Sequence, residues 1–167
     1  EHVYHQLANR PWAALYVAAF FFFMISLGTL AFYAIQRAAQ SGWSPVLFRV
    51  MEGITAYLLP GGLALLLILL LSTLHLNHLF IWMDPEVVEY DKIIKAKSGY
   101  LEPYFFLVRG VIYLSGWCLY RYFSRKFSHL QDRSNDNKYH IKNFKLSAVF
   151  LVFFLVTESM MSWDWIM

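Results

Sequence analysis

Two long runs without a single charged side chain constrain this chain more than any other feature of its sequence. Residues 11–35 and residues 53–76 contain no Asp, Glu, Lys or Arg. About 18 or more predominantly apolar residues in a row are enough to cross the hydrocarbon core of a bilayer as a helix. A helix also satisfies its own backbone hydrogen bonds, which lipid cannot do. The sequence therefore predicts an integral membrane protein of the all-α class.

Two further apolar segments, 104–122 and 144–165, complete the predicted membrane part. Charged residues make up only 15% of the 167 residues, and 59% are hydrophobic. Soluble domains usually carry about 25% charged residues. We therefore expect one domain over residues 1–167, in which four transmembrane helices form a four-helix bundle.

The distribution of Lys and Arg predicts how these helices are oriented. The connection over residues 121–145 is rich in basic residues, whereas the loop over 77–103 balances its lysines with acids. Because basic loops stay in the cytoplasm, the 121–145 connection is predicted to be cytoplasmic. The Glu1 end and the 77–103 loop are then periplasmic, as in a multi-pass protein of a bacterial inner membrane. A cytoplasmic linker is expected over about 126–140.

The periplasmic loop is predicted to contain a short amphipathic surface helix over about 85–97. Asp84 is a good N-cap, and acids precede lysines in the order that the helix dipole favours. His75 and His78 lie nearby and are predicted, with Asp84, to contact a partner or the membrane interface. A haem held between two helices would need a histidine from another span, and segments 104–122 and 144–165 contain none.

Two charged residues are predicted to lie inside the bilayer at similar depth. Arg109 and Glu158 sit about 9–10 Å from the periplasmic ends of their segments, at about 1.5 Å of rise per residue. Facing lipid, each would cost at least a few kcal/mol. We therefore expect both to face the bundle interior as an ion pair. Two interpretations stay open: a purely structural pair, or a protonatable site on a proton path.

A second group of polar residues lies at the cytoplasmic end of the second predicted span. Arg49 and Glu52 are three residues apart, which is the spacing of helical neighbours. They are interpreted either as an ion pair or, for Glu52, as the point where protons are taken up. Thr55 and Tyr57 would then extend the path. Asp164, between two tryptophans, is also a proton-path candidate, but we expect it to be a solvated carboxylate at the interface.

The remaining motifs favour a cofactor-free conduit or scaffold. Pro60-Gly61-Gly62 interrupts the second span, either as a kink with tight packing or as an opening for water or an ion. Cys118 is the only cysteine, so neither an internal disulfide nor a cysteine-ligated cluster can form within this chain. No catalytic motif, metal-binding tetrad or nucleic-acid patch is recognised. The chain is thus expected to bind no cofactor itself.

Three segments resemble a known family. HVYHQLANRPWAALYVAAFFFFMISLGTLAFYAIQ, HLNHLFIWMDPEVVEYD and TESMMSWDWIM are similar to the ActF-type membrane subunit of bacterial alternative complex III, which belongs to the polysulfide-reductase-like family. The likeness covers almost the whole chain. Its most specific parts are the 75–91 segment and the Trp163-Asp164-Trp165 sequence. In the family, helices precede and follow these segments, and we accordingly expect the chain to be an internal fragment.

The resemblance implies a non-catalytic subunit of an oxidoreductase complex. Such a complex passes electrons from quinol to cytochrome c or directly to a terminal oxidase. Haem c, iron–sulfur clusters and menaquinone would belong to partners: a multihaem cytochrome c, an iron–sulfur protein and a larger homologous membrane subunit. This subunit would anchor the complex among lipids and supply a proton half-channel. A membrane transporter bundle and an inert scaffold are the alternatives.

Overall fold

The computed structural model shows that all regular structure in the described part of the chain is helical. Side chains are described from Asn9 onward. The residues that the structure describes are 2–74, 76, 79–80, 92, 94, 97 and 99–166.

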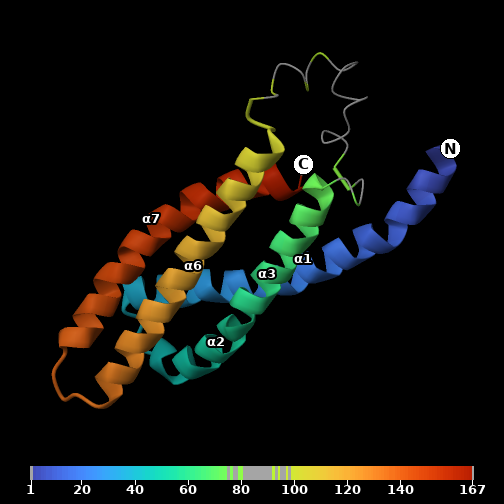
Figure 1. Cartoon of the computed structure of the whole chain (residues 1–167). Coiled ribbons are helices and arrows are strands. Elements are labelled where there is room, and N and C mark those ends of the chain that lie inside the picture. The colour runs from blue at the N-terminus through green and yellow to red at the C-terminus, as the bar shows by residue number, and fades with distance from the viewer. Residues whose placement is uncertain are drawn as a thin grey trace. The chain divides into compact units, whose positions relative to one another are not determined.

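Short helical elements follow the long helix α1, and the long helices α6 and α7 end the described part of the chain (Figure 1). The two longest, α1 and α6, each exceed the length of one membrane span. Two 3₁₀ turns, η1 and η2, flank the short helix α2. The elements are α1 (His2–Ala39), η1 (Ser44–Leu47), α2 (Phe48–Ile54), η2 (Thr55–Tyr57), α3 (Leu58–Thr73), α6 (Pro103–Asp132) and α7 (Lys138–Ile166).

Three helical stretches in the described residues are long and apolar enough to cross a membrane: Asn9–Ala39, Phe48–Thr73 and Lys138–Ile166. They contain most of the first, second and fourth predicted spans. The third predicted span, 104–122, is helical within α6 but is not among them. Arg109 and the tyrosines of this segment make it the most polar of the four. The fourth transmembrane helix and the four-helix bundle therefore remain predictions.

Pro60 explains the break in the second predicted span. A proline ring collides with the carbonyl group four residues earlier, which here belongs to Ala56. The chain responds with the 3₁₀ turn η2 at Thr55–Tyr57, and Pro60 falls in the first turn of α3. There its missing N–H leaves no hydrogen bond unmade. A 3₁₀ turn thus interrupts the helix just before the proline, and the choice between a kink and an opening for water or an ion stays a prediction.

The helices are shared between two compact units. Unit 1 comprises residues 1–22 and 60–112, and unit 2 comprises residues 23–59 and 113–167. In unit 1, the rings of Tyr16 and Phe106 both pack against Phe80, with ring centroids 5.9 and 5.8 Å away. Everything described below, except where unit 1 is named, lies in unit 2.

In unit 2, α6 and α7 form an antiparallel hairpin joined by a ladder of polar contacts (Figure 1). Trp117 Nε1 donates to Thr157 Oγ1 at 3.0 Å, and Tyr120 contacts Ser147 at 2.8 Å. Along each helix these residues are three or four positions apart, or separated by about a whole number of turns, so they line one face. The polar side chains of the two helices thus form hydrogen bonds with each other, which is the arrangement that a lipid environment favours. The full ladder is Tyr113–Asp164, Trp117–Thr157, Tyr120–Ser147 and Ser124–Asn143.

The predicted linker over 126–140 is wrong in extent. α6 continues to Asp132 and α7 already begins at Lys138, so only residues 133–137 connect them. The Gln131 side chain organises this turn: its amide donates to the Asp136 carbonyl at 2.9 Å, and its carbonyl accepts the His140 N–H at 2.8 Å. The polar residues of this stretch made it look like a linker, yet the Gln131 side chain ties the last turn of α6 to the connection and to the first turn of α7.

Gly116 of α6 lies in close contact with the Phe153 ring of α7. A Cβ atom there would overlap the ring of Phe153, whereas a Cβ at the exposed Gly28 in α1 would meet nothing within 4 Å. We expect Gly116→Ala to lower the free energy of unfolding of the full protein by about 1–2 kcal/mol, because the ring must move. Gly28→Ala should instead raise it by up to about 1 kcal/mol through helix propensity. Equal effects of the two changes in detergent unfolding would contradict the close contact.

Candidate functional site

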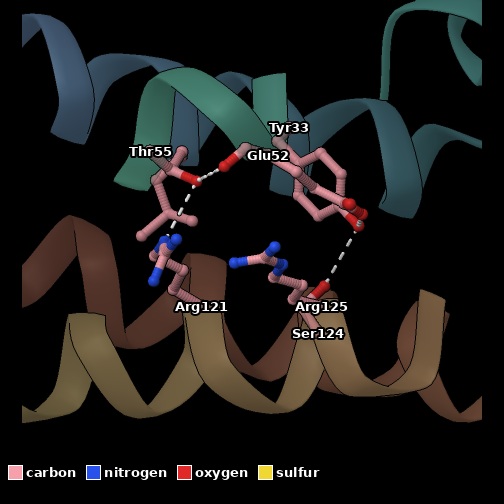
Figure 2. Close-up of a pocket in the computed structure, with 7 residues that line it drawn as sticks. Tyr33, Glu52, Thr55, Arg121, Ser124 and Arg125 are labelled. Atoms are coloured by element: carbon pink, nitrogen blue, oxygen red, sulfur yellow. Dashed lines mark hydrogen bonds between the residues drawn. The ribbon is translucent and has the colours of Figure 1, made fainter. Parts of the chain in front are cut away.

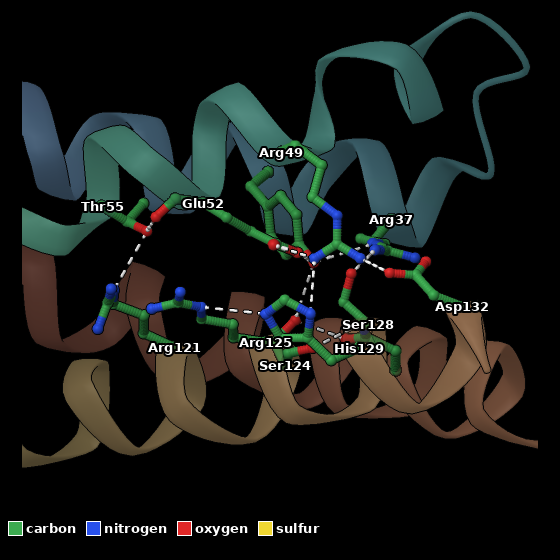
Figure 3. A network of polar contacts seen from close by, with 12 residues as sticks. Arg37, Arg49, Glu52, Thr55, Arg121, Ser124, Arg125, Ser128, His129 and Asp132 are labelled. Carbon is green, nitrogen blue, oxygen red and sulfur yellow. Dashed lines mark hydrogen bonds and ion pairs between the residues drawn. The ribbon is translucent and has the colours of Figure 1, made fainter.

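Glu52 lies at the centre of a buried polar network in unit 2 (Figure 3). Only 8% of its surface is exposed. The Tyr33 hydroxyl donates to Glu52 Oε1 at 3.2 Å, and Arg49 Nη1 donates to Oε2 at 2.7 Å. The ion pair predicted from the spacing of Arg49 and Glu52 is thus confirmed. The Glu52 network is defined as Tyr33, Arg37, Arg49, Glu52, Ser124, Arg125, Ser128, His129, Asp132 and Asn143.

Arg49 links this carboxylate to the exposed end of the network. Its Nη2 donates to Asp132 Oδ2, and its Nη1 also contacts His129 Nδ1 at 3.3 Å. The other ring nitrogen of His129 faces Arg125 Nε at 3.4 Å. Arginine can only donate, and a neutral imidazole has only one acceptor nitrogen, so His129 accepts from one arginine at a time. The choice of tautomer at His129 therefore decides which arginine it binds.

Arg37 enters the network from α1 and is 7% exposed. Its Nε donates to the Tyr33 hydroxyl at 3.2 Å, and its Nη2 donates to Ser128 Oγ at 3.1 Å. Its guanidinium also stacks on the Phe48 ring, with Cζ 3.9 Å from the centroid. Tyr33 thus accepts a hydrogen bond from Arg37 while it donates one to Glu52.

Ser124 and Asn143 extend the network into the hairpin. Ser124 Oγ lies 2.6 Å from Asn143 Oδ1 and 3.3 Å from the Tyr33 hydroxyl. A serine has only one hydroxyl proton, and the shorter contact assigns it to Asn143. Asn143 Nδ2 returns a bond to the Ser124 carbonyl at 3.2 Å. Ser147 donates to the Asn143 carbonyl at 2.8 Å, so the direct side-chain path from Glu52 ends at Asn143.

A small cavity lies beside Glu52 (Figure 2). Its volume is about 10 Å³. A single ordered water needs roughly 10–15 Å³ and two to four polar partners. The side chains around this space supply such partners, and Figure 2 shows Arg121 bound to Thr55 on one side and Ser124 bound to Tyr33 on the other. The lining residues are Leu30, Tyr33, Glu52, Thr55, Arg121, Ser124 and Arg125.

Neither protein-family models nor curated proteins match this chain. The resemblance to alternative complex III rests on the sequence segments alone. What the site does must therefore be argued from its geometry.

Of the proton-path residues predicted around Glu52, one lies at the site. Thr55 is buried and lines the cavity, where its hydroxyl accepts from Arg121 Nε at 3.2 Å. Its own proton goes to the backbone carbonyl of Glu52 at 2.9 Å rather than to the carboxylate. Tyr57 is 42% exposed and does not line the cavity. Tyr57 is the last residue of the 3₁₀ turn η2.

Glu158 and Asp164 both lie on α7. Glu158 is half-buried. Asp164 is 4% exposed and accepts a hydrogen bond from the Tyr113 hydroxyl at 3.3 Å. The expectation that Asp164 is solvated is wrong, because its face of α7 packs against α6. Its role on a proton path stays a prediction.

Arg109 belongs to unit 1 and is 7% exposed. Its Nη1 donates to the Tyr100 carbonyl at 3.0 Å, and its guanidinium stacks on the Tyr100 ring at 4.0 Å. These contacts bury the guanidinium, and its depth in the bilayer stays a prediction. Glu158 belongs to unit 2, so its pairing with Arg109 stays a prediction.

The predicted partner contacts cannot be placed. His75, His78 and Asp84 lie outside the described residues, as does nearly all of the surface helix predicted over 85–97. In the described part of the chain, no group of three or more His, Cys, Asp or Glu side chains has the geometry of a metal site.

Sequence reasoning missed most of the network. Tyr33 and Arg37, Ser124 and Ser128, and Asn143 and Ser147 are each four residues apart on helices that are otherwise apolar. Such pairs share a helix face, which was the available signal. Only the fold, however, brings the three faces together.

Proposed function

We propose that this chain is an integral membrane subunit of a quinol-oxidising electron-transfer complex, and that its Glu52 network takes up protons from the cytoplasmic side. The sequence resemblance supports the complex. Three apolar helices support the membrane location. The observation that carries the proton role is the buried carboxylate of Glu52, bound to Tyr33 and Arg49 beside a water-sized cavity.

The chemistry of the network suits proton transfer. Carboxylates inside membrane proteins are costly to bury and commonly mark proton relays. Asp132, 59% exposed, is joined through Arg49 to Glu52, which gives the carboxylate a polar connection to the exterior. A water in the cavity would bring a proton to Glu52, whose carboxylate is held by the hydrogen bond from the Tyr33 hydroxyl. Arginine itself stays charged and only orients the carboxylates.

A second candidate function is that of a structural subunit, in which the network only locks helices together. The pairing of Glu52 with Arg49 favours it, since a neutralised carboxylate needs no proton. The two functions differ in what happens when Glu52 is replaced by a neutral side chain of the same shape.

The membership of a complex is tested by purification. The full protein, tagged and extracted in mild detergent from its native membrane, should bring down a multihaem cytochrome c and an iron–sulfur subunit, with quinol:cytochrome c oxidoreductase activity. Purification of the protein without redox-active partners would instead favour the transporter bundle or the inert scaffold.

A further inference from the structure

A second, larger cavity lies on the other side of Arg49. Its volume is about 220 Å³, whereas the one beside Glu52 measures about 10 Å³. A space of this size admits a tetrahedral oxyanion or a headgroup rather than a single water. It lies between the end of α1, the η1 turn and the ends of α6 and α7 that face each other across the hairpin turn. The lining residues are Arg37, Pro45, Phe48, Arg49, Ser128, Gln131, Asp132 and His140.

The cations that line this cavity outnumber the anions. Arg37 and Arg49 line the cavity together with one carboxylate, Asp132, and it is Arg49 that pairs with this carboxylate and with Glu52. Within the described part of the chain, no carboxylate lies within ion-pairing distance of Arg37. Both of its hydrogen bonds go to neutral hydroxyl groups, of Tyr33 and Ser128. A guanidinium has five donors in a planar fork, so the rest of this fork can bind an oxyanion in the cavity.

The cavity opens beside an apolar surface. Pro45 and Phe48 form part of its wall. Trp43, Val46 and Val50, at the same end of unit 2, are 58%, 83% and 58% exposed. Exposed apolar side chains and an interfacial tryptophan suit the boundary between lipid tails and headgroups. Such a surface suits the acyl chains of a lipid, which a free inorganic anion lacks.

We propose that the Arg37 cavity binds the phosphate group of an anionic phospholipid from the cytoplasmic leaflet. The phosphodiester oxygens accept from the free edge of the Arg37 guanidinium, while Arg49 remains held by Asp132. The acyl chains lie along Trp43, Val46 and Val50. Burial of Arg37 is then compensated by an anion that the membrane supplies, since a buried charge requires a partner. This proposal does not depend on proton transfer or on the identity of the complex.

The test is lipid retention by the full protein, measured by native mass spectrometry after exchange into phosphatidylglycerol or phosphatidylcholine with the same acyl chains. Wild type should retain phosphatidylglycerol preferentially. Arg37→Gln should lower that retention about tenfold or more, as loss of one charge-assisted contact implies. Arg133→Gln removes an exposed arginine from the hairpin turn, outside the cavity, and should leave retention unchanged.

Three outcomes would overturn the proposal. Equal retention of the two lipids by wild type would exclude headgroup recognition, and this comparison needs no variant, so it decides even where Arg37→Gln does not fold. Equal losses in Arg37→Gln and Arg133→Gln would show that only general surface charge matters. Displacement of phosphatidylglycerol by an excess of inorganic phosphate would assign the cavity to a free anion instead.

Discussion

Replacing Glu52 by Gln should lower proton uptake by the full complex about tenfold or more, because general acid–base groups contribute about 10²–10⁴-fold to the steps they serve. The Gln side chain has nearly the same shape and keeps one oxygen that can accept from either Tyr33 or Arg49, so one of the two hydrogen bonds is lost together with the charge. What is lost is the group that binds the proton. The measurement is proton uptake coupled to quinol oxidation, with the complex reconstituted in vesicles.

Two further variants make this result interpretable. Asp136→Asn removes a carboxylate that is exposed in the hairpin turn, and proton uptake should stay at the wild-type level. Glu158→Gln tests the other predicted carboxylate in the same assay. If Glu52→Gln takes up protons as fast as Asp136→Asn while the complex stays assembled, the network has a structural role only. If only Glu158→Gln lowers proton uptake, the proton path runs through Glu158 instead of Glu52.

The helical fold could be predicted because lipid leaves few alternatives. Runs such as 11–35 and 53–76 must satisfy their backbone groups internally, and helices do so. The boundaries were harder, as shown by α6, which reaches Asp132 although its last turns are polar. Those turns stay helical because they pack against α7 and because the Gln131 side chain, on the last turn of α6, bonds the connection and the first turn of α7. Such tertiary contacts cannot be predicted from the hydropathy of the local sequence.

The site was only partly predictable for the same reason. Arg49 and Glu52 are neighbours on one helix, so spacing alone predicted their ion pair, at 2.7 Å. Tyr33 contacts Glu52 across 19 residues, and Arg37 contacts Ser128 across 91. No local pattern specifies which distant hydroxyl meets a buried charge. The expected solvation of Asp164 failed similarly, since the flanking tryptophans suggested an interface while Tyr113 binds it in the α6–α7 seam.

Trp117 is the largest fully buried side chain of unit 2, with 0% of its surface exposed. Its ring packs against four aromatic residues, and its Nε1 donates to Thr157 at 3.0 Å. It therefore joins α1, α6 and α7 by packing and by one hydrogen bond. The four rings, with centroids 6.1–6.4 Å away, are those of Phe23, Tyr113, Phe154 and Trp165.

Trp117→Ala should lower the free energy of unfolding of the full protein by about 3 kcal/mol, the low end of the range for large aromatic deletions. The low end applies because lipid tails are as apolar as the helix faces, so the loss comes from packing contacts and the cavity left behind. Trp117→Phe keeps most of the ring contacts and should cost only about 1 kcal/mol, for the lost hydrogen bond. Equilibrium unfolding in mixed detergent micelles, followed by circular dichroism, measures all three proteins.

The matched control is Trp163→Ala on α7, which removes a tryptophan that is 62% exposed. Because that side chain leaves no cavity, its loss should cost at most about 0.5 kcal/mol. The difference between the two alanine variants isolates the packing at Trp117 from the general effect of deleting an indole. Equal losses would mean that the aromatic cluster does not hold α1 against the hairpin, and the helix arrangement that positions Tyr33 beside Glu52 would then lack its main support.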